Sequence, residues 1–483
     1  MIGADNSRNH SLSPTGVDWL TVLVYIALMV VGWVSIYAAV YDESHASIFD
    51  ISQNYGKQLI WIGVSLFIAI AILLIDDKYW HILAQPLYWI SILVLAGTAL
   101  FGVEVNGAKA WYEFGPVRIQ PVEFVKITTS LVLARVMSSY SFNIHHPRSV
   151  LSLVLFIGLP VFIIVVLQND TGSALVYGSF LFMLYREGLN GWFYVVLFLL
   201  IGLFLLSFYV APAPLLILLL VAAVLAEGMM NGRWKSKLIY LAAVALLTLA
   251  LYFGLRLLGA EISFYLSLLI SAGVSLILVV LYAYRNRLKN TMLIVILFIG
   301  SLGFTHSIDY GFDHFLQYHQ QKRILDLLGL ESDPQGFGYN VNQSKIAIGS
   351  GGFLGKGFLN GTQTKYDFVP EQSTDFIFCT IGEEWGFVGS ILVIALFVIL
   401  ILRLVAMGER QQEAFGRIYC YCVAGIFLFH LLVNIGMTIG LMPVIGIPLP
   451  FISYGGSSMM AFTILLFIAV RLDSSKKTHI TRI

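Results

Sequence analysis

Charged residues are scarce in this chain. Only 11% of its 483 residues are charged, 58% are hydrophobic, and the mean hydropathy is +0.85. A typical soluble domain carries about 25% charged residues, so this composition excludes a water-soluble enzyme and an intrinsically disordered protein. The formal net charge of +1 gives no indication of a nucleic-acid partner. A chain this apolar requires lipid as its solvent.

Cysteine is scarce too. There are three, Cys379, Cys420 and Cys422, and the last two would face different sides of a helix because they are two residues apart. We therefore expect neither a disulfide nor a metal site. No cleavable signal peptide is expected either, because the first apolar run, residues 17–40, is too long for one and is typical of a spanning helix.

Long apolar runs, by contrast, are abundant. A spanning helix needs about 20 predominantly apolar residues. Three runs are weak, because 121–137 carries charges and 172–185 and 213–227 are short. With the clear runs they predict an all-α polytopic membrane protein, a helical bundle with about 14 spans. The clear runs are 17–40, 58–75, 82–102, 150–167, 191–209, 237–258, 262–284, 291–305, 386–405, 417–437 and 456–471.

The distribution of basic residues predicts the orientation. When the N-terminus is placed in the cytoplasm and the spans alternate, most of the 28 Lys and Arg residues fall on the cytoplasmic side. Short cytoplasmic loops normally carry this excess, whereas long loops count for little. We therefore predict that both termini are cytoplasmic and that residues 306–385 form one large ordered outer loop. Its beginning, residues 312–328, predicts an amphipathic helix in the outer interface.

The end of this loop contains a candidate catalytic carboxylate. Asp375 is followed at once by the apolar residues Phe-Ile-Phe, where the loop meets a predicted span. Partial desolvation raises the pKa of a carboxylate, which suits a general base. The alternative is a structural role, because Ser373, Thr374 and Asp375 all suit the N-cap of a helix. The sequence leaves both interpretations open.

Other polar residues lie in or beside the predicted spans. Glu123 and Lys126 share one helix face at i, i+3, and ionisable residues at membrane depth mark either a functional interior or a structural ion pair. Trp111 could stack on a sugar or anchor the chain at the membrane interface. Asp170 could cap the span after it or line a cavity.

Residues 440–458 are rich in proline and glycine and cannot form a regular helix. Irregular backbone at membrane depth is tolerated only against protein or a cavity. We therefore expect a re-entrant or packed outer element, which could form one wall of a lipid groove. No nucleotide-binding motif is present, because Gly-Ser-Gly-Gly at 349–352 lacks the Gly-Lys-Ser/Thr ending of a phosphate loop.

Five stretches resemble the SEDS family (shape, elongation, division and sporulation), and within it the branch that acts in cell elongation. They are residues 107–126, 168–175, 342–361, 370–389 and 434–458. The chain departs from the family pattern at a few positions. Gln168-Asn169 stand for Lys-Pro, Thr171 for leucine, Ser373 for histidine and Val122 for a common serine.

The resemblance implies a ten-span core, so about four spans are extra. No family motif falls within residues 191–284, and we place the extra spans there. The expected parts are an N-terminal membrane core (1–190), the inserted helices (191–284), a core span (285–305), the outer catalytic loop (306–385), and a C-terminal core with a cytoplasmic tail (386–483).

The resemblance also implies an activity: polymerisation of lipid II into glycan strands at the outer face of the bacterial cytoplasmic membrane during cell elongation. Asp375 aligns with the family's catalytic aspartate and would activate the acceptor GlcNAc 4-hydroxyl. Arg118, Lys345, Lys356 or a divalent cation, Mg or Mn, would neutralise the leaving pyrophosphate. No resident metal ligand is identified. Substrate contacts are expected from Trp111, Arg118, Glu123, Lys126, Asp170, Lys345, Lys356, Glu371 and Thr374.

A class B penicillin-binding protein, a transpeptidase, is the partner that the resemblance implies, together with the elongation machinery. Two other functions remain open: a lipid II flippase, and a scaffold that only recruits the transpeptidase. A transporter normally shows internal repeats and helices broken at the midplane, and we find no clear repeat. Motifs concentrated on one face of the membrane favour an enzyme.

Overall fold

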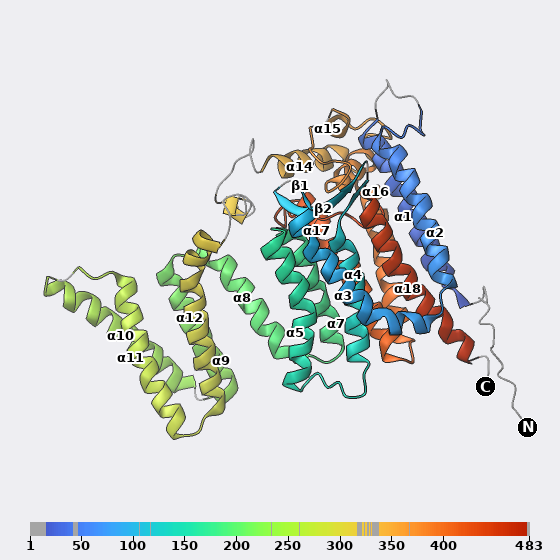
Figure 1. Ribbon diagram of the computed structural model, residues 1–483. Helices are drawn as coiled ribbons and strands as arrows, with labels where there is room; N and C mark the ends of the chain where they lie inside the picture. The colour runs from blue at the N-terminus through green and yellow to red at the C-terminus, as the bar shows by residue number, and fades with distance from the viewer. Residues whose placement is uncertain are drawn as a thin grey trace, which may run out of the picture. The chain divides into compact units, whose positions relative to one another are not determined.

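The computed structural model describes residues 16–41, 47–105, 107–115, 117–232, 234–259, 261–315, 321–322, 324–325, 328, 330, 338–366 and 368–480. The chain divides into two compact units. Unit 1 comprises residues 1–189 and 322–483, and unit 2 comprises residues 190–321 (Figure 1). Helices dominate both units, which confirms the all-α class.

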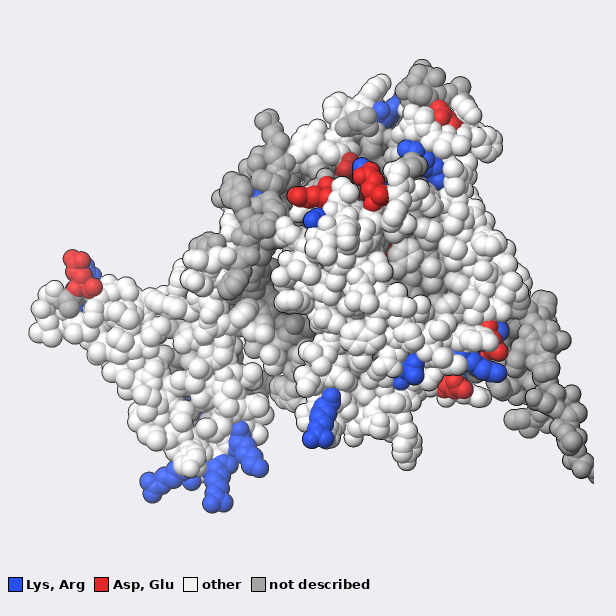
Figure 2. All heavy atoms as spheres, in the orientation of Figure 1, with Lys and Arg blue, Asp and Glu red and all other residues white. Residues whose placement is uncertain are grey.

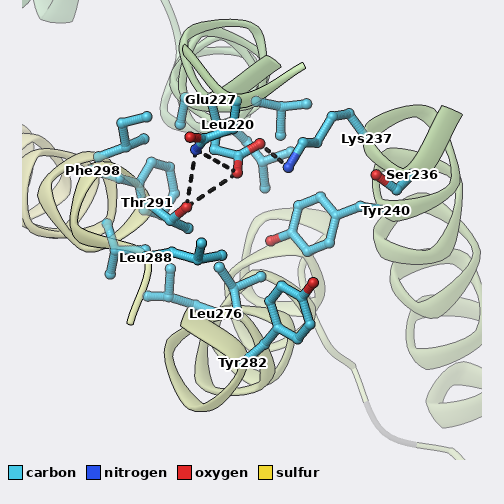
Figure 3. A pocket seen from close by; sticks show the side chains of 16 residues that line it. Leu220, Glu227, Ser236, Lys237, Tyr240, Leu276, Tyr282, Leu288, Thr291 and Phe298 are labelled. Atoms are coloured by element: carbon cyan, nitrogen blue, oxygen red, sulfur yellow. Dashed lines mark hydrogen bonds and ion pairs between the residues drawn. The ribbon is translucent and has the colours of Figure 1, made fainter. Parts of the chain in front are cut away.

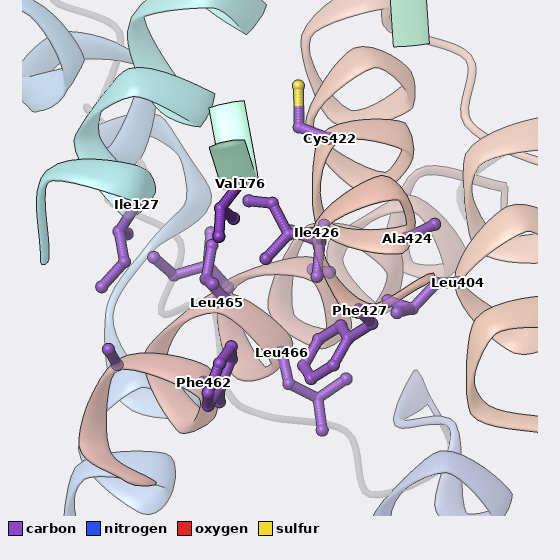
Figure 4. Close-up of a cluster of buried hydrophobic side chains, with 14 of the residues drawn as sticks. Ile127, Val176, Leu404, Cys422, Ala424, Ile426, Phe427, Phe462, Leu465 and Leu466 are labelled. Carbon is purple, nitrogen blue, oxygen red and sulfur yellow. The ribbon is translucent and has the colours of Figure 1, made fainter. Parts of the chain in front are cut away.

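Unit 1 is a bundle whose centre is formed by α17 and α18. In the membrane-spanning windows of α17 and α18, 78% and 83% of the residues are buried, whereas in the window of α2 only 22% of the residues are buried. Lipid-facing helices therefore surround these two. Phe427, Leu465 and Val176 are among the buried side chains of the apolar core around these two helices (Figure 4). The helices of unit 1 are α1 (Trp19–Ala39), α2 (Asn54–Leu74), α3 (Asp77–Phe101), α4 (Pro121–Met137), α5 (Pro147–Phe162), α6 (Thr171–Leu175), α7 (Phe180–Arg186), α14 (Tyr339–Gly351), α15 (Thr362–Lys365), α16 (Ile377–Glu409), α17 (Ala414–Thr438) and α18 (Gly456–Ile480).

A small antiparallel sheet joins α3 to α4. Its strands are β1 (Val103–Val105), β2 (Ala108–Phe114) and β3 (Val117–Ile119), in the order β1-β2-β3. The hydrophobic pattern did not predict these strands, because two of them have only three residues and they are stabilised by pairing with each other.

Unit 2 has its own apolar core. Leu203, Leu216, Leu268 and Phe298 meet there, from four different helices. Because Phe298 and its neighbours bury their side chains in this core, α12 packs on α8, α9 and α11. The unit is therefore longer than the predicted insertion at 191–284 and takes in the predicted core span 285–305. Its helices are α8 (Gly191–Tyr209), α9 (Pro212–Asn231), α10 (Trp234–Leu257), α11 (Phe264–Arg285) and α12 (Lys289–Phe315).

All fourteen predicted spans are helical, and among the residues that the structure describes twelve helices are long and apolar enough to cross a membrane. The other two predicted spans are short. Helix α4 has 17 residues, and 172–185 falls on α6 and α7, which are separated by a 3-10 turn at Val176–Ser179. The chain is a multi-pass membrane protein, and the count of fourteen stays a prediction.

Helices extend into the predicted outer loop, residues 306–385, from both sides. Helix α12 continues to Phe315, and α16 begins at Ile377 rather than at residue 386. Gly386 kinks α16 with φ 63°, and a Cβ there would lie 2.3 Å from the backbone nitrogen of Gly355. Only glycine allows this kink and this close approach. Eight of the seventeen residues of the amphipathic stretch predicted at 312–328 lie outside the described residues.

Candidate functional site

Asp375 lies in a compact turn, residues 371–376, immediately before α16. The backbone nitrogens of Thr374 and Phe376 donate to the carbonyl of Glu371, at 3.1 and 3.2 Å. The hydroxyl of Thr374 donates to the Glu371 carboxylate at 2.9 Å. Phe376, and none of the three predicted residues, occupies the N-cap position of α16, and its own side chain makes no capping hydrogen bond. The capping interpretation of Ser373, Thr374 and Asp375 is therefore wrong.

Three successive backbone carbonyls of this turn accept hydrogen bonds from residues outside it. Ser373 O accepts from the backbone nitrogen of Tyr454 at 2.9 Å, and Thr374 O accepts from the Ser453 hydroxyl at 2.7 Å. Asp375 O accepts from the side-chain amide of Asn434 at 2.8 Å. The turn is consequently anchored to α17 and to residues 440–455, which we call the connecting segment.

The carboxyl group of Asp375 faces the same segment. Its side chain is half-buried, and a Cβ added at Gly446 would lie 3.3 Å from Asp375 Oδ2. Gly446 has φ 75°, a conformation that favours glycine. Backbone thus passes close to the carboxylate at a residue without a side chain, and Asp375 itself stays partly exposed.

The connecting segment is irregular and packed on protein, as its proline and glycine content predicted. Asn434 donates to Ile447 O at 2.8 Å, in addition to its bond with Asp375. Gly32 of α1 lies against the segment so closely that a Cβ would come within 2.6 Å of the Ile452 Cα. A groove wall for lipid stays a prediction, but the segment clearly positions the turn that bears Asp375.

A buried polar cluster lies beneath the connecting segment. Lys126 Nζ is 3.0 Å from Glu123 Oε1 and 3.2 Å from His430 Nε2, and His430 Nδ1 is 3.0 Å from Pro448 O. A protonated lysine only donates, so His430 Nε2 accepts and its Nδ1–H donates to Pro448. His430 is therefore neutral in this arrangement. It links the ion pair to the segment that holds Asp375.

Sequence reasoning missed His430 and Asn434. Both are polar residues inside the apolar run 417–437, and an ionisable residue at membrane depth is the signal that would have identified the histidine. They lie four residues apart, so both project from one face of α17. Their partners, Pro448 and Ile447, are adjacent in the connecting segment.

Glu383, also missed, organises the glycine-rich stretch before the turn. Its buried carboxylate accepts from Lys356 Nζ at 2.6 Å and from the backbone nitrogens of Thr362, Gln363 and Thr364 at 2.8–3.0 Å. Two consecutive glutamates in an apolar helix were the available signal. Lys356 is therefore committed to a structural ion pair.

The remaining predicted residues fall into two groups. Asp170 caps α6 through the backbone nitrogen of Ser173 at 2.9 Å, which confirms its capping role. Two residues on, Gly172 lies against Ile445 of the connecting segment. Lys345 is exposed on α14, with its side chain against Gly440, the first residue of that segment.

The second group lies on the sheet. Arg118 of β3 is paired with Glu113 of β2 at 3.1 Å, directly across the strands, and Trp111 of β2 is half-buried. The structure thus gathers Asp375, Lys126, Lys345 and the Asp170 turn around the connecting segment, whereas the ion pair of Arg118 stays within the sheet. Within the described part of the chain, no group of three or more His, Cys, Asp or Glu residues could hold a metal ion.

These features define a polytopic helical membrane protein with a carboxylate fixed beside an irregular, packed segment. The family model of the FtsW, RodA and SpoVE proteins, described as cell cycle protein, matches residues 18–217 and 211–478. The peptidoglycan glycosyltransferase RodA of Treponema pallidum is 32% identical over 462 residues, covering 94% of this chain and 98% of the relative. The peptidoglycan glycosyltransferase MrdB of Escherichia coli K12 is 29% identical, covering 95% and 94%.

Solved structures share the fold. A chain from a peptidoglycan synthase complex, described as showing the structural coordination of polymerization and crosslinking, has a TM-score of 0.57 at 24% identity and covers 95% of this chain and 98% of its own. A variant of RodA from Thermus thermophilus has a TM-score of 0.53 at 21% identity, covering 95% and 97%. The chain belongs to the FtsW/RodA/SpoVE family, the SEDS family, and is a membrane-embedded glycosyltransferase.

Proposed function

We propose that this chain polymerises lipid II into glycan strands at the outer face of the bacterial cytoplasmic membrane, with both of its own termini in the cytoplasm. The relatives named peptidoglycan glycosyltransferase support the reaction class. One observation carries the assignment of the base: the hydrogen bonds from Tyr454, Ser453 and Asn434 that hold the backbone of residues 373–375. A general base acts only from a fixed position, and these bonds supply one.

The reaction is a direct displacement. The 4-hydroxyl of the incoming GlcNAc attacks the anomeric carbon of the growing strand, the new C–O bond forms, and the bond to polyprenyl pyrophosphate breaks. Asp375 accepts the hydroxyl proton, and the pyrophosphate leaves with the electron pair of the broken bond. One carboxylate is sufficient because a single displacement inverts the anomeric centre. General-base assistance is typically worth about 10²–10⁴-fold in rate.

The leaving pyrophosphate requires positive charge. Of the three predicted cations, Lys356 is paired with buried Glu383 and Arg118 with Glu113, whereas Lys345 is exposed beside the connecting segment. Lys345 is therefore the protein cation that we assign to the pyrophosphate, with a divalent cation, Mg or Mn, as a second source of charge. Glu371, Thr374 and Trp111 are proposed to contact the sugar and the peptide.

A transpeptidase partner belongs to the same proposal. Glycan strands become a wall only when they are crosslinked, and a solved chain with this fold comes from a complex that coordinates polymerization and crosslinking. We propose a class B penicillin-binding protein of the elongation machinery as that partner.

The decisive experiment is polymerisation in detergent. The purified chain, with and without the transpeptidase, is incubated with lipid II, and glycan strands are resolved by gel electrophoresis. We expect strands from the parent and from Glu413→Gln, which changes an exposed carboxylate before α17, and at least about 10²-fold slower synthesis by Asp375→Asn. A flippase would make no polymer in detergent, where transport has no meaning. Normal synthesis by a folded Asp375→Asn variant would exclude the aspartate as base.

A further inference from the structure

Unit 2 contains a pocket that the glycosyl transfer does not use. Its volume is about 470 Å³, and side chains of four helices, α9 to α12, line it (Figure 3). Most of the lining is apolar, including Leu220, Leu276 and Phe298. An open apolar space of this size among membrane helices is suited to a hydrocarbon chain.

One end of the pocket is polar. Glu227 of α9 is buried, forms an ion pair with Lys237 of α10, and accepts hydrogen bonds from Asn231 and Thr291 at 3.2 Å each (Figure 3). This cluster links α9, α10 and α12 by an ion pair and hydrogen bonds. It lies at the end of the bundle where short connections lead into α10 and into α12. The pocket is therefore amphipathic, with its polar groups at the end of the helices.

The same end is strongly basic. Lys235, Arg285, Arg287 and Lys289 are exposed there, immediately beside the lining residues Ser236, Tyr282 and Leu288. None of the four forms an ion pair with a described residue, and the only acidic residue between 190 and 260, Glu227, is already paired with Lys237. Figure 2 shows a group of basic side chains at this end with no acidic side chain visible among them.

A second cavity, of about 290 Å³, adjoins the pocket between α10 and α11. The two share Tyr240, Val279 and Tyr282, and the second extends along α10 to Leu247. From Lys237 to Leu247 a helix rises about 15 Å, which is half of the roughly 30 Å hydrocarbon thickness of a bilayer. The cavities together therefore span about the depth of one membrane leaflet.

We propose that unit 2 binds an anionic phospholipid of one leaflet, with its phosphate at the basic end and one acyl chain in the two cavities. Charge complementarity selects this occupant: unpaired bases at the mouth favour an anionic headgroup, while the apolar interior favours a hydrocarbon chain. Basic pockets between membrane helices are known to take up such headgroups. The predicted orientation places this end in the cytoplasmic leaflet. The proposal does not depend on the chemistry at Asp375.

Binding is tested on the purified full chain in detergent. Fluorescent phosphatidylglycerol is titrated by anisotropy, and three unlabelled competitors are compared: phosphatidylglycerol, phosphatidylcholine and soluble glycerol 3-phosphate. We expect phosphatidylglycerol to compete at least about ten-fold better than phosphatidylcholine, and glycerol 3-phosphate not to compete. Equal competition by phosphatidylcholine would overturn recognition of the headgroup charge. Displacement by glycerol 3-phosphate would show that the ligand is a free phosphate ester rather than a lipid.

Two variants locate the site. Replacing Lys235, Arg285 and Lys289 together by Gln should weaken binding by about five-fold for each charge removed, because every base near an anionic headgroup contributes comparably. The matched control is Arg256→Gln, an exposed base at the opposite end of α10, which should bind like the parent.

Val279→Phe places a ring in both cavities and should abolish uptake of the acyl chain while the surface charge is unchanged. Folding of each variant is followed by thermal unfolding. If Val279→Phe does not fold, the comparison of the triple Gln variant with Arg256→Gln alone tests whether the lipid binds at this end. Unchanged binding in the triple variant would overturn the proposal, as would unchanged binding in a folded Val279→Phe.

Discussion

The side-chain amide of Asn434 donates one hydrogen bond to the backbone carbonyl of Asp375 and another to that of Ile447, each at 2.8 Å. One buried residue of α17 therefore connects the turn that bears the proposed base to the connecting segment. One helical turn earlier, His430 reaches Pro448 in the same way. The position of Asp375 thus depends on residues outside the turn that bears it.

Replacing Asn434 by Leu should reduce polymerisation more than it reduces binding of lipid II. The change keeps the size of the side chain but leaves two carbonyls without their donor, at a cost of about 1–3 kcal/mol each when buried. Turnover, binding of lipid II and the melting temperature are measured on the purified variant. Thr438→Val, one turn further along α17, removes only a bond within its own helix and serves as the control. If Asn434→Leu polymerises as fast as the control, the anchor is dispensable.

Exchanging Glu123 and Lys126, the buried pair, should only partly restore the stability that is lost when either residue is replaced. Lys126→Met leaves the carboxylate uncompensated in the core, which typically destabilises by about 3–5 kcal/mol. Exchanging the two residues restores the pair but not the contact between lysine and His430, so rescue should be partial. Thermal unfolding of both single variants, Glu123→Gln and Lys126→Met, and of the exchanged variant measures this. Unchanged melting temperatures in both single variants would show that the pair is incidental.

Stability should fall in acid because of Asp18, which precedes α1. Burial raises the pKa of this carboxyl, but hydrogen bonds from Arg403 and Arg410 outweigh burial and lower the pKa below its ordinary value of 3.8. The carboxylate therefore stabilises the fold at pH values above 3.8, and this contribution is lost as the pH falls through the lowered pKa.

The measurement is the melting temperature between pH 6 and pH 2. Asp18→Asn should melt lower than the parent at pH 6, by the equivalent of about 1.5–3 kcal/mol, and the difference should shrink in acid. The exposed carboxylate variant Glu413→Gln should follow the parent throughout. If the difference in melting temperature between Asp18→Asn and the parent stays constant across this pH range, the stabilising role assigned to the Asp18 carboxylate is contradicted.

The orientation can be tested with single cysteines, because Cys379, Cys420 and Cys422 are all buried and give little background. Asn360→Cys, on the exposed stretch before α15, should react with a membrane-impermeant thiol reagent added to intact cells. Arg287→Cys, on the exposed connection before α12, should react only after the cells are opened. Labelling of position 287 from outside would show that the topology of unit 2 is the reverse of the predicted one.

Local properties of the sequence were sufficient to predict the class of protein and to place Asp375 where the outer loop meets a helix. Apolar runs form helices wherever they are long enough, because each run satisfies its own backbone hydrogen bonds. The proline and glycine residues of 440–458 excluded a helix for equally local reasons. The motifs around Asp375 identified the family.

Only the tertiary structure decided what holds Asp375 and which helices pack together. The donors to residues 373–375 come from Asn434, Ser453 and Tyr454, about sixty to eighty residues further along the chain, and no local pattern encodes such a contact. Helix α12 joined unit 2 because its buried face matches that core, although its apolar composition suits either unit. Hydropathy predicts that a helix will be buried in the membrane, whereas the fit between side chains determines its neighbours.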